Sequence, residues 1–263
     1  MKLPLYQLDA FSDHLFGGNP AAVVPLEHWL PDSVLAAIAA ENNLSETAFV
    51  IPHESGSHLR WFTPTVEVDL CGHATLATAQ VLFQHYFPEA DELCFSTLSG
   101  PLRVSRDGGL LSLDFPAKPG TAVEITEQLC AALGRRPREV WQARDLMAVF
   151  DSEAEVRTLR PDMEKISGLD AFAVIVTAPG DQVDFVSRFF APAKGVPEDP
   201  VTGSAHCTLI PYWANRLDKI RLHARQVSAR GGELFCEWRG ERVSIAGRAV
   251  EYMRGVINLS AVE

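Results

Sequence analysis

Residues 195–206 read GVPEDPVTGSAH, and residues 67–75 read EVDLCGHAT. In each stretch, acidic residues come just before a glycine and a polar residue, which are Gly203-Ser204 and Gly72-His73. An apolar segment with helical spacing follows each pair, so each pair is predicted to open a helix. A helix start leaves backbone N–H groups unpaired and carries a partial positive charge, and glycine lets a ligand approach closely. Two such starts facing one cleft would hold a small anion between them.

The similarity between the two stretches extends upstream. Residues 60–64 read RWFTP and residues 188–192 read RFFAP. Because strand, loop and helix start recur in the same order, the sequence favours two similar halves; chance resemblance of two aromatic-proline turns is the alternative. The Pro- and Gly-containing run at 116–120 interrupts the pattern. The halves are therefore expected at 1–120 and 121–263, with the last strand of the tail free to cross back to the first half.

The composition of the 263-residue chain excludes several classes of function. Hydrophobic residues make up 47%, enough for a substantial core, and the net charge of −11 argues against a nucleic-acid surface. Five cysteines without a Cys-x-x-Cys pair argue against a disulfide framework and structural zinc. The start of the chain lacks a signal-peptide pattern, and no apolar run reaches the roughly 18 residues that cross a membrane. The sequence therefore predicts a protein of the reducing cytoplasm, with neither a membrane nor a nucleic-acid partner.

The hydrophobic periodicity predicts few helices and many short strands. Helices are expected at 31–40, 72–86, 126–133 and 203–215. Strands are expected at 3–11, 21–24, 47–51, 59–63, 92–97, 102–106, 110–115, 146–150, 171–177, 183–189, 220–224, 233–238, 242–245 and 249–257. Apart from one strand, the region 140–169 gives no clear pattern. Strands that follow one another rather than alternating with helices indicate an α+β fold.

Two residues of the first half could move protons. Glu46 stands where a polar loop enters an apolar strand. A carboxylate held in an apolar cleft has a raised pKa and can act as a base near neutral pH; a solvated loop carboxylate is the alternative. His73, at a predicted helix start, could hydrogen-bond a substrate or carry a proton. The alternative for His73 is a packed histidine with a satisfied ring, which is the favoured interpretation of His206.

Three further residues lie next to the predicted helix starts. Asp199 precedes a proline that restrains the backbone, so its carboxylate can be aimed at a ligand, or it can stabilise the helix dipole. Ser204 could cap its helix or give its hydroxyl to a ligand, but no Gly-x-Ser-x-Gly elbow surrounds it. Cys71 is a thiol at a helix start, where its pKa would fall; a small buried residue is the alternative.

The remaining polar signals are weaker. Asp9 and Asn19 could line the same cleft, as could Gln226 and the turn at 230–232. The sequence contains no phosphate-binding loop, no dinucleotide fingerprint and no paired-histidine metal motif. Neither a cofactor nor a metal is therefore expected.

Taken together, these runs closely resemble the phenazine-biosynthesis (PhzF-like) isomerase family, which is related to diaminopimelate epimerase. Besides the stretches already quoted, the matching motifs are FGGNPAAVV at 16–24, NLSETAFV at 43–50 and QVSARGG at 226–232. They follow one another in order along almost the whole chain and are highly specific as a set. Residues 121–169 carry no motif that matches.

The resemblance implies a diaminopimelate-epimerase-like fold: two similar halves, each a mixed sheet wrapped around a central helix. It also implies a cofactor-free isomerase with its site in the cleft between the halves. In such a site Glu46 would shuttle a proton, and His73 and Asp199 would bind and polarise the substrate. The backbone around Gly72 and Gly203 would hold the substrate carboxylate, together with the serine hydroxyl of the second helix.

One departure from the epimerase relatives bears on the mechanism. For those relatives, the resemblance implies a two-thiol mechanism with one cysteine in each half. Here Cys71 keeps one thiol, but Thr202 stands at the other position, and a threonine hydroxyl is a far poorer base than a thiolate. A single base at Glu46, which takes the proton and returns it elsewhere on the same face, therefore fits better than symmetric two-base racemisation.

The leading hypothesis is a cofactor-independent isomerase that moves a proton at carbon in a small carboxylate substrate. Two alternatives stay open: an amino-acid epimerase or racemase that uses Cys71, and a non-catalytic protein that binds small carboxylates. A homodimer could form through an exposed strand such as 110–115. The sequence names neither the substrate nor the oligomeric state.

Overall fold

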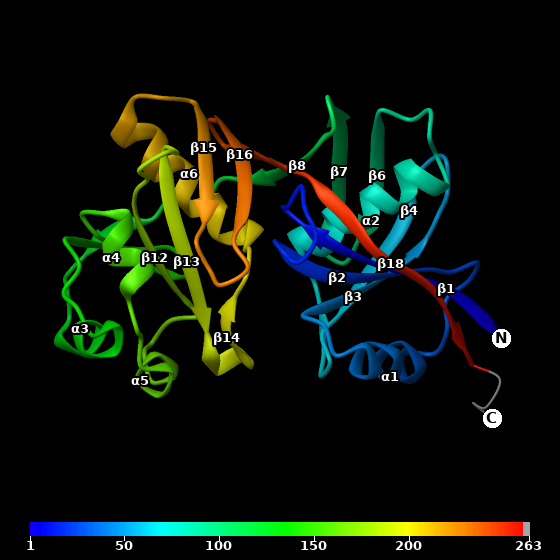
Figure 1. The fold of residues 1–263 in the computed structure, drawn as a ribbon, viewed down its shortest axis with the longest axis horizontal. Helices are drawn as coiled ribbons and strands as arrows, with labels where there is room; N and C mark the ends of the chain where they lie inside the picture. Colours follow the sequence, from blue (N-terminus) through cyan, green and yellow to red (C-terminus); the bar gives the residue numbers. More distant parts are fainter. Residues whose placement is uncertain (260–263) are drawn as a thin grey trace. The chain divides into compact units, whose positions relative to one another are not determined.

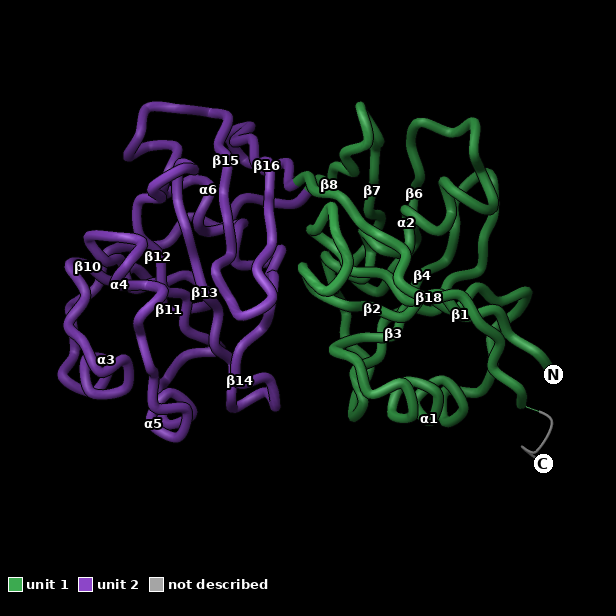
Figure 2. Tube along the Cα trace, in the orientation of Figure 1, with its two compact units in different colours: residues 1–114, 246–263 green, residues 115–245 purple. Residues whose placement is uncertain are grey.

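The chain forms two compact units in a computed structural model, which describes residues 1–259. One unit is residues 1–114 with the C-terminal segment from residue 246, and the other is residues 115–245 (Figure 2). The division expected from the sequence lay at residue 120. The last strand, β18 (Ala249–Asn258), pairs antiparallel with the first, β1 (Lys2–Ala10), within the first unit (Figure 1).

The first unit contains a mixed sheet and two helices. The helices are α1 (Asp32–Asn42) and α2 (Gly72–His85). Besides β1 and β18, the strands are β2 (Asn19–Pro25), β3 (Glu46–Ile51), β4 (Ser57–Phe62), β5 (Glu67–Val68), β6 (Glu92–Thr97), β7 (Gly100–Asp107) and β8 (Leu110–Pro116). Strands β2 and β3 run parallel, as do β4 and β6, while β3 pairs antiparallel with β4.

Helix α2 is the centre of this unit. It contacts β1, β2 and β3, and nearly every residue from His73 to Phe83 is buried (Figure 1). Small side chains such as Ala74, Ala77 and Ala79 let the strands approach the helix closely. A helix that is apolar on all sides belongs in a core rather than on a surface.

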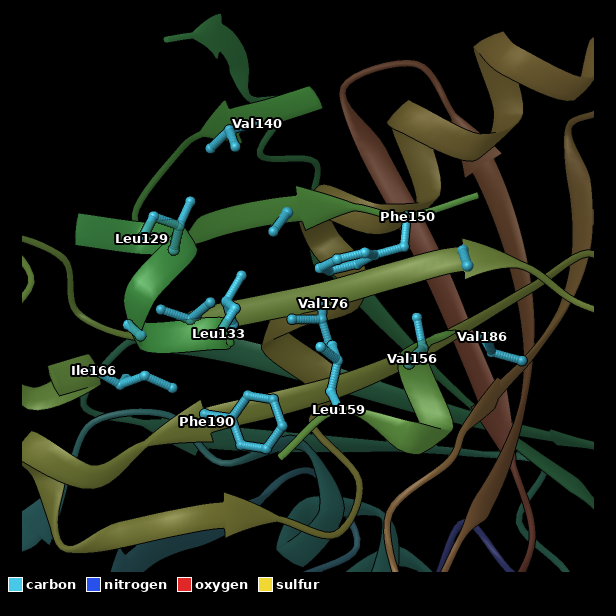
Figure 3. Packing of buried hydrophobic residues seen from close by; sticks show 14 of the residues in the cluster. Leu129, Leu133, Val140, Phe150, Val156, Leu159, Ile166, Val176, Val186 and Phe190 are labelled. Carbon is cyan, nitrogen blue, oxygen red and sulfur yellow. The ribbon is translucent and has the colours of Figure 1, made fainter. Parts of the chain in front are cut away.

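The second unit has more elements. Its helices are α3 (Glu127–Leu133), α4 (Glu153–Thr158), α5 (Met163–Ser167), the 3₁₀ turn η1 (Pro192–Lys194) and α6 (Gly203–Leu217). Its strands are β9 (Thr121–Val123), β10 (Glu139–Gln142), β11 (Leu146–Val149), β12 (Val174–Pro179), β13 (Phe185–Ala191), β14 (Val196–Asp199), β15 (Arg221–Gln226), β16 (Gly232–Arg239) and β17 (Arg242–Gly247). Leu133, Phe150 and Phe190 belong to one cluster of its core (Figure 3).

The two units repeat the same order of strand pairings. Strands β2 and β3 pair in parallel, as do β11 and β12. The antiparallel partners β3 and β4 correspond to β12 and β13, and the parallel partners β4 and β6 correspond to β13 and β15. Helix α6 is buried over most of its length and contacts β15 and β16. The predicted fold class, two similar halves with a mixed sheet around a central helix, is confirmed.

A half-buried ion pair explains why the same residues recur in both halves. Arg60 of β4 donates two hydrogen bonds of 2.7 Å to Glu67 of β5. Arg188 of β13 donates bonds of 2.7 and 3.0 Å to Glu198 of β14 in the same bidentate arrangement. Such paired N–H···O bonds fix geometry as well as adding energy. Each pair therefore holds the loop that leads into a central helix.

Helix α6 continues through a proline. Pro211 has no N–H, so it cannot donate to the carbonyl of Cys207 four residues earlier. That carbonyl accepts a hydrogen bond of 2.9 Å from the backbone N–H of Lys118 instead. The helix therefore tolerates the proline because another segment of the same unit supplies the missing donor.

The longest predicted helices and strands are found within a few residues of their expected ends. Several short helices and strands of the structure are not predicted by the periodicity. The structure adds β5, β9, β10, β14, α4 and α5, none of which the periodicity indicated. The strand expected at 171–177 begins three residues later, at Val174. Among the described residues, no helix is both long and apolar enough to span a membrane.

Candidate active site

A tight loop before β2 fixes Asn19 in the interior of the first unit. Gly18 has a φ of 63°, and a Cβ atom there would lie 2.1 Å from the Ala10 carbonyl oxygen, so only glycine fits. The backbone N–H of Phe16 donates a 2.8 Å hydrogen bond to the buried carboxylate of Asp9. The Asn19 side chain that follows is fully buried.

Four side chains meet at the start of α2. His73 Nε2 lies 3.1 Å from Glu46 Oε2. On the other side of the ring, His73 Nδ1 is 3.2 Å from Asn19 Nδ2 and 3.5 Å from Cys71 Sγ. The structure thus brings together Glu46, His73, Asn19 and Cys71, four residues that the sequence singled out.

The charge of His73 depends on its neighbours. Burial by itself lowers the pKa of an imidazole, but Cys71 and Glu46 together outweigh burial and hold the pKa of His73 well above its ordinary value. The Asn19 side chain can form a hydrogen bond with either the neutral or the protonated ring of His73. Its N–H can donate to a neutral ring nitrogen, and the rotated amide would offer an oxygen to a protonated one.

The Cys71 thiol behaves differently from the sequence-based expectation. A helix start was expected to lower its pKa, but burial and then the Glu46 carboxylate raise it. The thiol is 6% exposed, so the cost of removing a thiolate from water exceeds the effect of the helix dipole. Burial therefore opposes formation of the thiolate at this position.

In the second unit, Gln226 holds the loop that leads into α6. Its Oε1 accepts a 2.9 Å bond from the Thr202 N–H, and its Nε2 donates a 2.7 Å bond to the Asp199 carbonyl. The Thr202 hydroxyl donates to the Asp199 carboxylate. Gln226 is 1% exposed, so its amide supports the backbone around Asp199 and Thr202.

Ser204 lies in the first turn of α6, next to a residue that the sequence did not indicate. Arg144 forms two hydrogen bonds to the buried carboxylate of Asp145 and places its Nη2 atom 3.3 Å from Ser204 Oγ. A guanidinium and a hydroxyl at a helix start can both bind an anion. Arg144 falls in the segment without a recognisable motif, so no signal in the sequence could have found it.

Both central helices begin without a side-chain cap. The N-cap residues are Cys71 for α2 and Thr202 for α6, and within the described chain neither side chain accepts a bond from its own helix. Ser204 is therefore inside the helix rather than its cap. The first-turn N–H groups that follow Gly72 and Gly203 remain suited to an anionic ligand.

Two similar units, each with an uncapped central helix inside a mixed sheet, define the class of diaminopimelate-epimerase-like isomerases and epimerases. The family described as phenazine biosynthesis-like protein (PhzC-PhzF) matches residues 8–255. The chain therefore belongs to this phenazine biosynthesis-like family, as the motifs predicted.

Similar proteins agree with this assignment. The chain is 55% identical over 261 residues to a protein named as an uncharacterised isomerase of Pseudomonas aeruginosa, covering 99% of this chain and 100% of the relative. A solved PhzF-family protein of Enterococcus faecalis has a TM-score of 0.97 at 49% identity, covering 98% of this chain and 100% of that one. A predicted epimerase of Pseudomonas aeruginosa shares the fold with a TM-score of 0.75 at 18% identity, with 98% and 100% covered. The protein is accordingly an enzyme of the isomerase and epimerase class.

Proposed function

We propose that the protein is a cofactor-independent isomerase that moves a proton at carbon in a small carboxylate substrate, with Glu46 as its single base. One observation carries this proposal. Glu46 Oε2 and His73 Nε2 are buried atoms 3.1 Å apart, and within the described chain neither makes a hydrogen bond of regular geometry. Buried polar atoms with incomplete hydrogen bonding cost free energy, so they are expected where a substrate completes the bonding.

The chemistry follows from the charges at this site. Glu46 removes a proton from the carbon next to the substrate carboxylate and returns it elsewhere on the same face. The negative charge that develops on the substrate is stabilised by uncapped N–H groups and by His73, whose raised pKa favours its protonated form. Asn19 keeps the His73 ring in position.

The second unit is assigned to substrate binding in this proposal. The Gly203 and Ser204 backbone and the Ser204 hydroxyl bind the carboxylate of the substrate, while Asp199 binds a polar group elsewhere on it. Gln226 acts as a positioning residue, because its buried amide is fully engaged with the backbone and hydroxyl of the adjacent loop.

The first test is Glu46→Gln, which keeps the shape of the side chain but removes the base. A panel of small cyclic and aromatic carboxylates and amino acids is screened by thermal shift, and each stabilising compound is then incubated with enzyme in deuterated water. Glu46→Gln is expected to bind such a compound but to lose turnover by at least about 100-fold. Glu41→Gln, which changes an exposed carboxylate of α1, is the control and should retain full activity.

Normal deuterium uptake by Glu46→Gln would remove Glu46 from the mechanism. If a stabilising compound gave neither deuterium uptake nor product with the unaltered enzyme, the non-catalytic carboxylate-binding alternative would replace the proposal.

An amino-acid epimerase or racemase that uses Cys71 is the weaker alternative. Cys71 and Thr202 occupy the same N-cap position of the two central helices, and the Thr202 hydroxyl is bound to Asp199. Cys71→Ser discriminates the two mechanisms, since a single Glu46 base predicts activity within a few-fold of normal, whereas a thiol mechanism predicts its loss.

The cytoplasmic location and the homodimer also belong to this proposal. Strand β8, expected from the sequence to be an exposed edge, pairs with both β7 and β17, so it does not offer the open edge that was expected for the dimer. Light scattering on the purified protein tests the dimer, and a monomer mass would remove it.

A further inference from the structure

Glu46, Cys71 and His73 form a cluster whose chemistry extends beyond proton transfer. One ligand atom from each residue, a carboxylate oxygen, a thiol sulfur and a ring nitrogen, lies within 4.8 Å of the other two. The residues come from the start of β3 and the start of α2, so their spacing in the sequence matches no metal-binding motif.

We propose that these three side chains bind a zinc ion, and that the bound ion inhibits the enzyme. The proposal that zinc binds follows from the cluster alone, whereas the proposal that zinc inhibits the enzyme rests on the proposed function of Glu46. Zinc bound by Glu46 and by one ring nitrogen of His73 would occupy the carboxylate that proton transfer requires.

The distances suit tetrahedral zinc. A Zn–S bond of about 2.3 Å and a Zn–N bond of about 2.1 Å at the tetrahedral angle place sulfur and nitrogen about 3.6 Å apart. The Cys71 Sγ to His73 Nδ1 distance is 3.5 Å. Even the longest separation in the cluster would have to shorten by only about 1 Å to reach the spacing of tetrahedral zinc ligands. Glu46 can make this adjustment, because its side chain is 19% exposed and stands at the start of its strand.

The ligand types and charges select the metal. A thiolate and an imidazole favour zinc or cadmium over magnesium and calcium, which prefer oxygen ligands. On binding, the Cys71 thiol gives its proton to water and forms a metal–sulfur bond. The thiolate and the Glu46 carboxylate then neutralise the two positive charges of the ion, which offsets both burial and the positive end of α2. Three protein ligands leave one position open, as in zinc sites that also bind water.

Binding is tested on the metal-stripped, full-length protein without any substrate. Competition with a chromophoric chelator should show one tightly bound zinc ion per chain. Cadmium should produce the ultraviolet thiolate-to-metal charge-transfer band in the unaltered protein. Cys71→Ser and His73→Asn are expected to weaken zinc binding by roughly 100-fold or more, and Cys71→Ser to abolish the band.

Two controls exclude general metal affinity. Cys94→Ser removes an exposed thiol, and Glu251→Gln breaks a 2.9 Å pair between His85 and a carboxylate elsewhere in the first unit. Both should bind zinc normally. Unaltered zinc affinity in folded Cys71→Ser, or the absence of the cadmium band in the unaltered protein, would overturn the site.

The inhibitory effect is measured separately, by deuterium uptake at increasing zinc concentration. Uptake should fall in parallel with occupancy and return when a chelator is added. Stoichiometric binding with unchanged or increased turnover would overturn the inhibition while leaving the site. Loss of the proposed isomerase function would appear instead as absent turnover in the metal-free enzyme.

Discussion

His73 couples the stability of the protein to pH. Its pKa is higher in the folded protein than the ordinary value of about 6.5. Its contribution to stability is therefore fully present below about pH 6.5 and is lost as pH rises through the raised pKa. We expect the difference in unfolding free energy between the protein and His73→Gln to shrink as pH rises from 6.5. Urea unfolding at a series of pH values measures this difference in unfolding free energy. His28→Gln, which changes an exposed histidine, is the control. A difference that stays constant with pH would contradict the predicted pH dependence.

His206 couples the stability of the protein to pH in the opposite direction. Burial lowers its pKa to about 4, and its Nδ1 bonds to the Thr202 carbonyl at 2.8 Å. Because the unfolded chain takes up a proton that the folded one refuses, stability falls as pH decreases from about 6.5 to about 4, by at most about 3 kcal/mol. His206→Asn can still donate to the carbonyl but does not titrate. It should lose this part of the acid sensitivity, which acid titration of the unfolding free energy tests.

At the scale of residues, the sequence predicts which residues belong to the site better than it predicts their burial, their neighbours and their pKa values. Glu46 and His73 could be selected because a carboxylate before a strand and a histidine after a glycine are local signals. The pKa of Cys71 could not be predicted, since burial by distant strands outweighs the helix start on which the expectation rested. Arg144 could not be selected either, because only the folded chain brings it to Ser204.

The bidentate ion pairs are the features that repeat at the scale of elements. Arg188 is 11% exposed and Glu198 25% exposed, and Arg188 also donates to the carbonyls of Val156 and Leu159. Glu198→Gln leaves this guanidinium without its counter-charge, so we expect a loss of about 2 kcal/mol, between the values for exposed and buried pairs.

Glu92→Gln is the matched control for this change. The Glu92–Arg103 contact is 3.5 Å long, and both side chains are more than half exposed. Its effect should stay below about 0.5 kcal/mol. Equal losses for both variants in chemical denaturation would show that burial does not strengthen the Arg188 pair.

The elements that the sequence could predict are those whose signal is local. Helices α2 and α6 begin at the glycines that the pattern indicated, because the start and the apolar spacing lie in one continuous segment. Strands β5 and β14 are not predicted, because segments of two to four residues show no periodicity. They become strands only by pairing with β4 and β13. The Arg and Glu residues repeated in both halves were the available signal for that pairing.

At the scale of the whole molecule, the two units share a scaffold and differ at the chemistry. The residue after the helix-starting glycine is His73 in one unit and Ser204 in the other, and the N-cap is Cys71 in one and Thr202 in the other. The ion pair that holds each helix start is the same in both. The fold is therefore a repeated scaffold, while the differences at these few positions assign proton transfer to one unit and anion binding to the other in our proposal.

The first unit is discontinuous in sequence, and this leads to a prediction about stability. Strand β18 pairs with β1 along its whole length, whereas residues 115–245 form their unit without it. In a chain that ends at Gly247, β1 would keep its pairing with β2 but would lose the hydrogen bonds along its other edge. We expect at least tenfold faster amide hydrogen exchange in β1 of that chain, with little change in β12 and α6, because proteins open in separate cooperative units. Mass spectrometry of peptides after exchange makes the comparison within one sample. Faster exchange in both units alike would show that the chain unfolds as a single cooperative unit, and unchanged exchange in β1 would show that β18 contributes nothing to its stability.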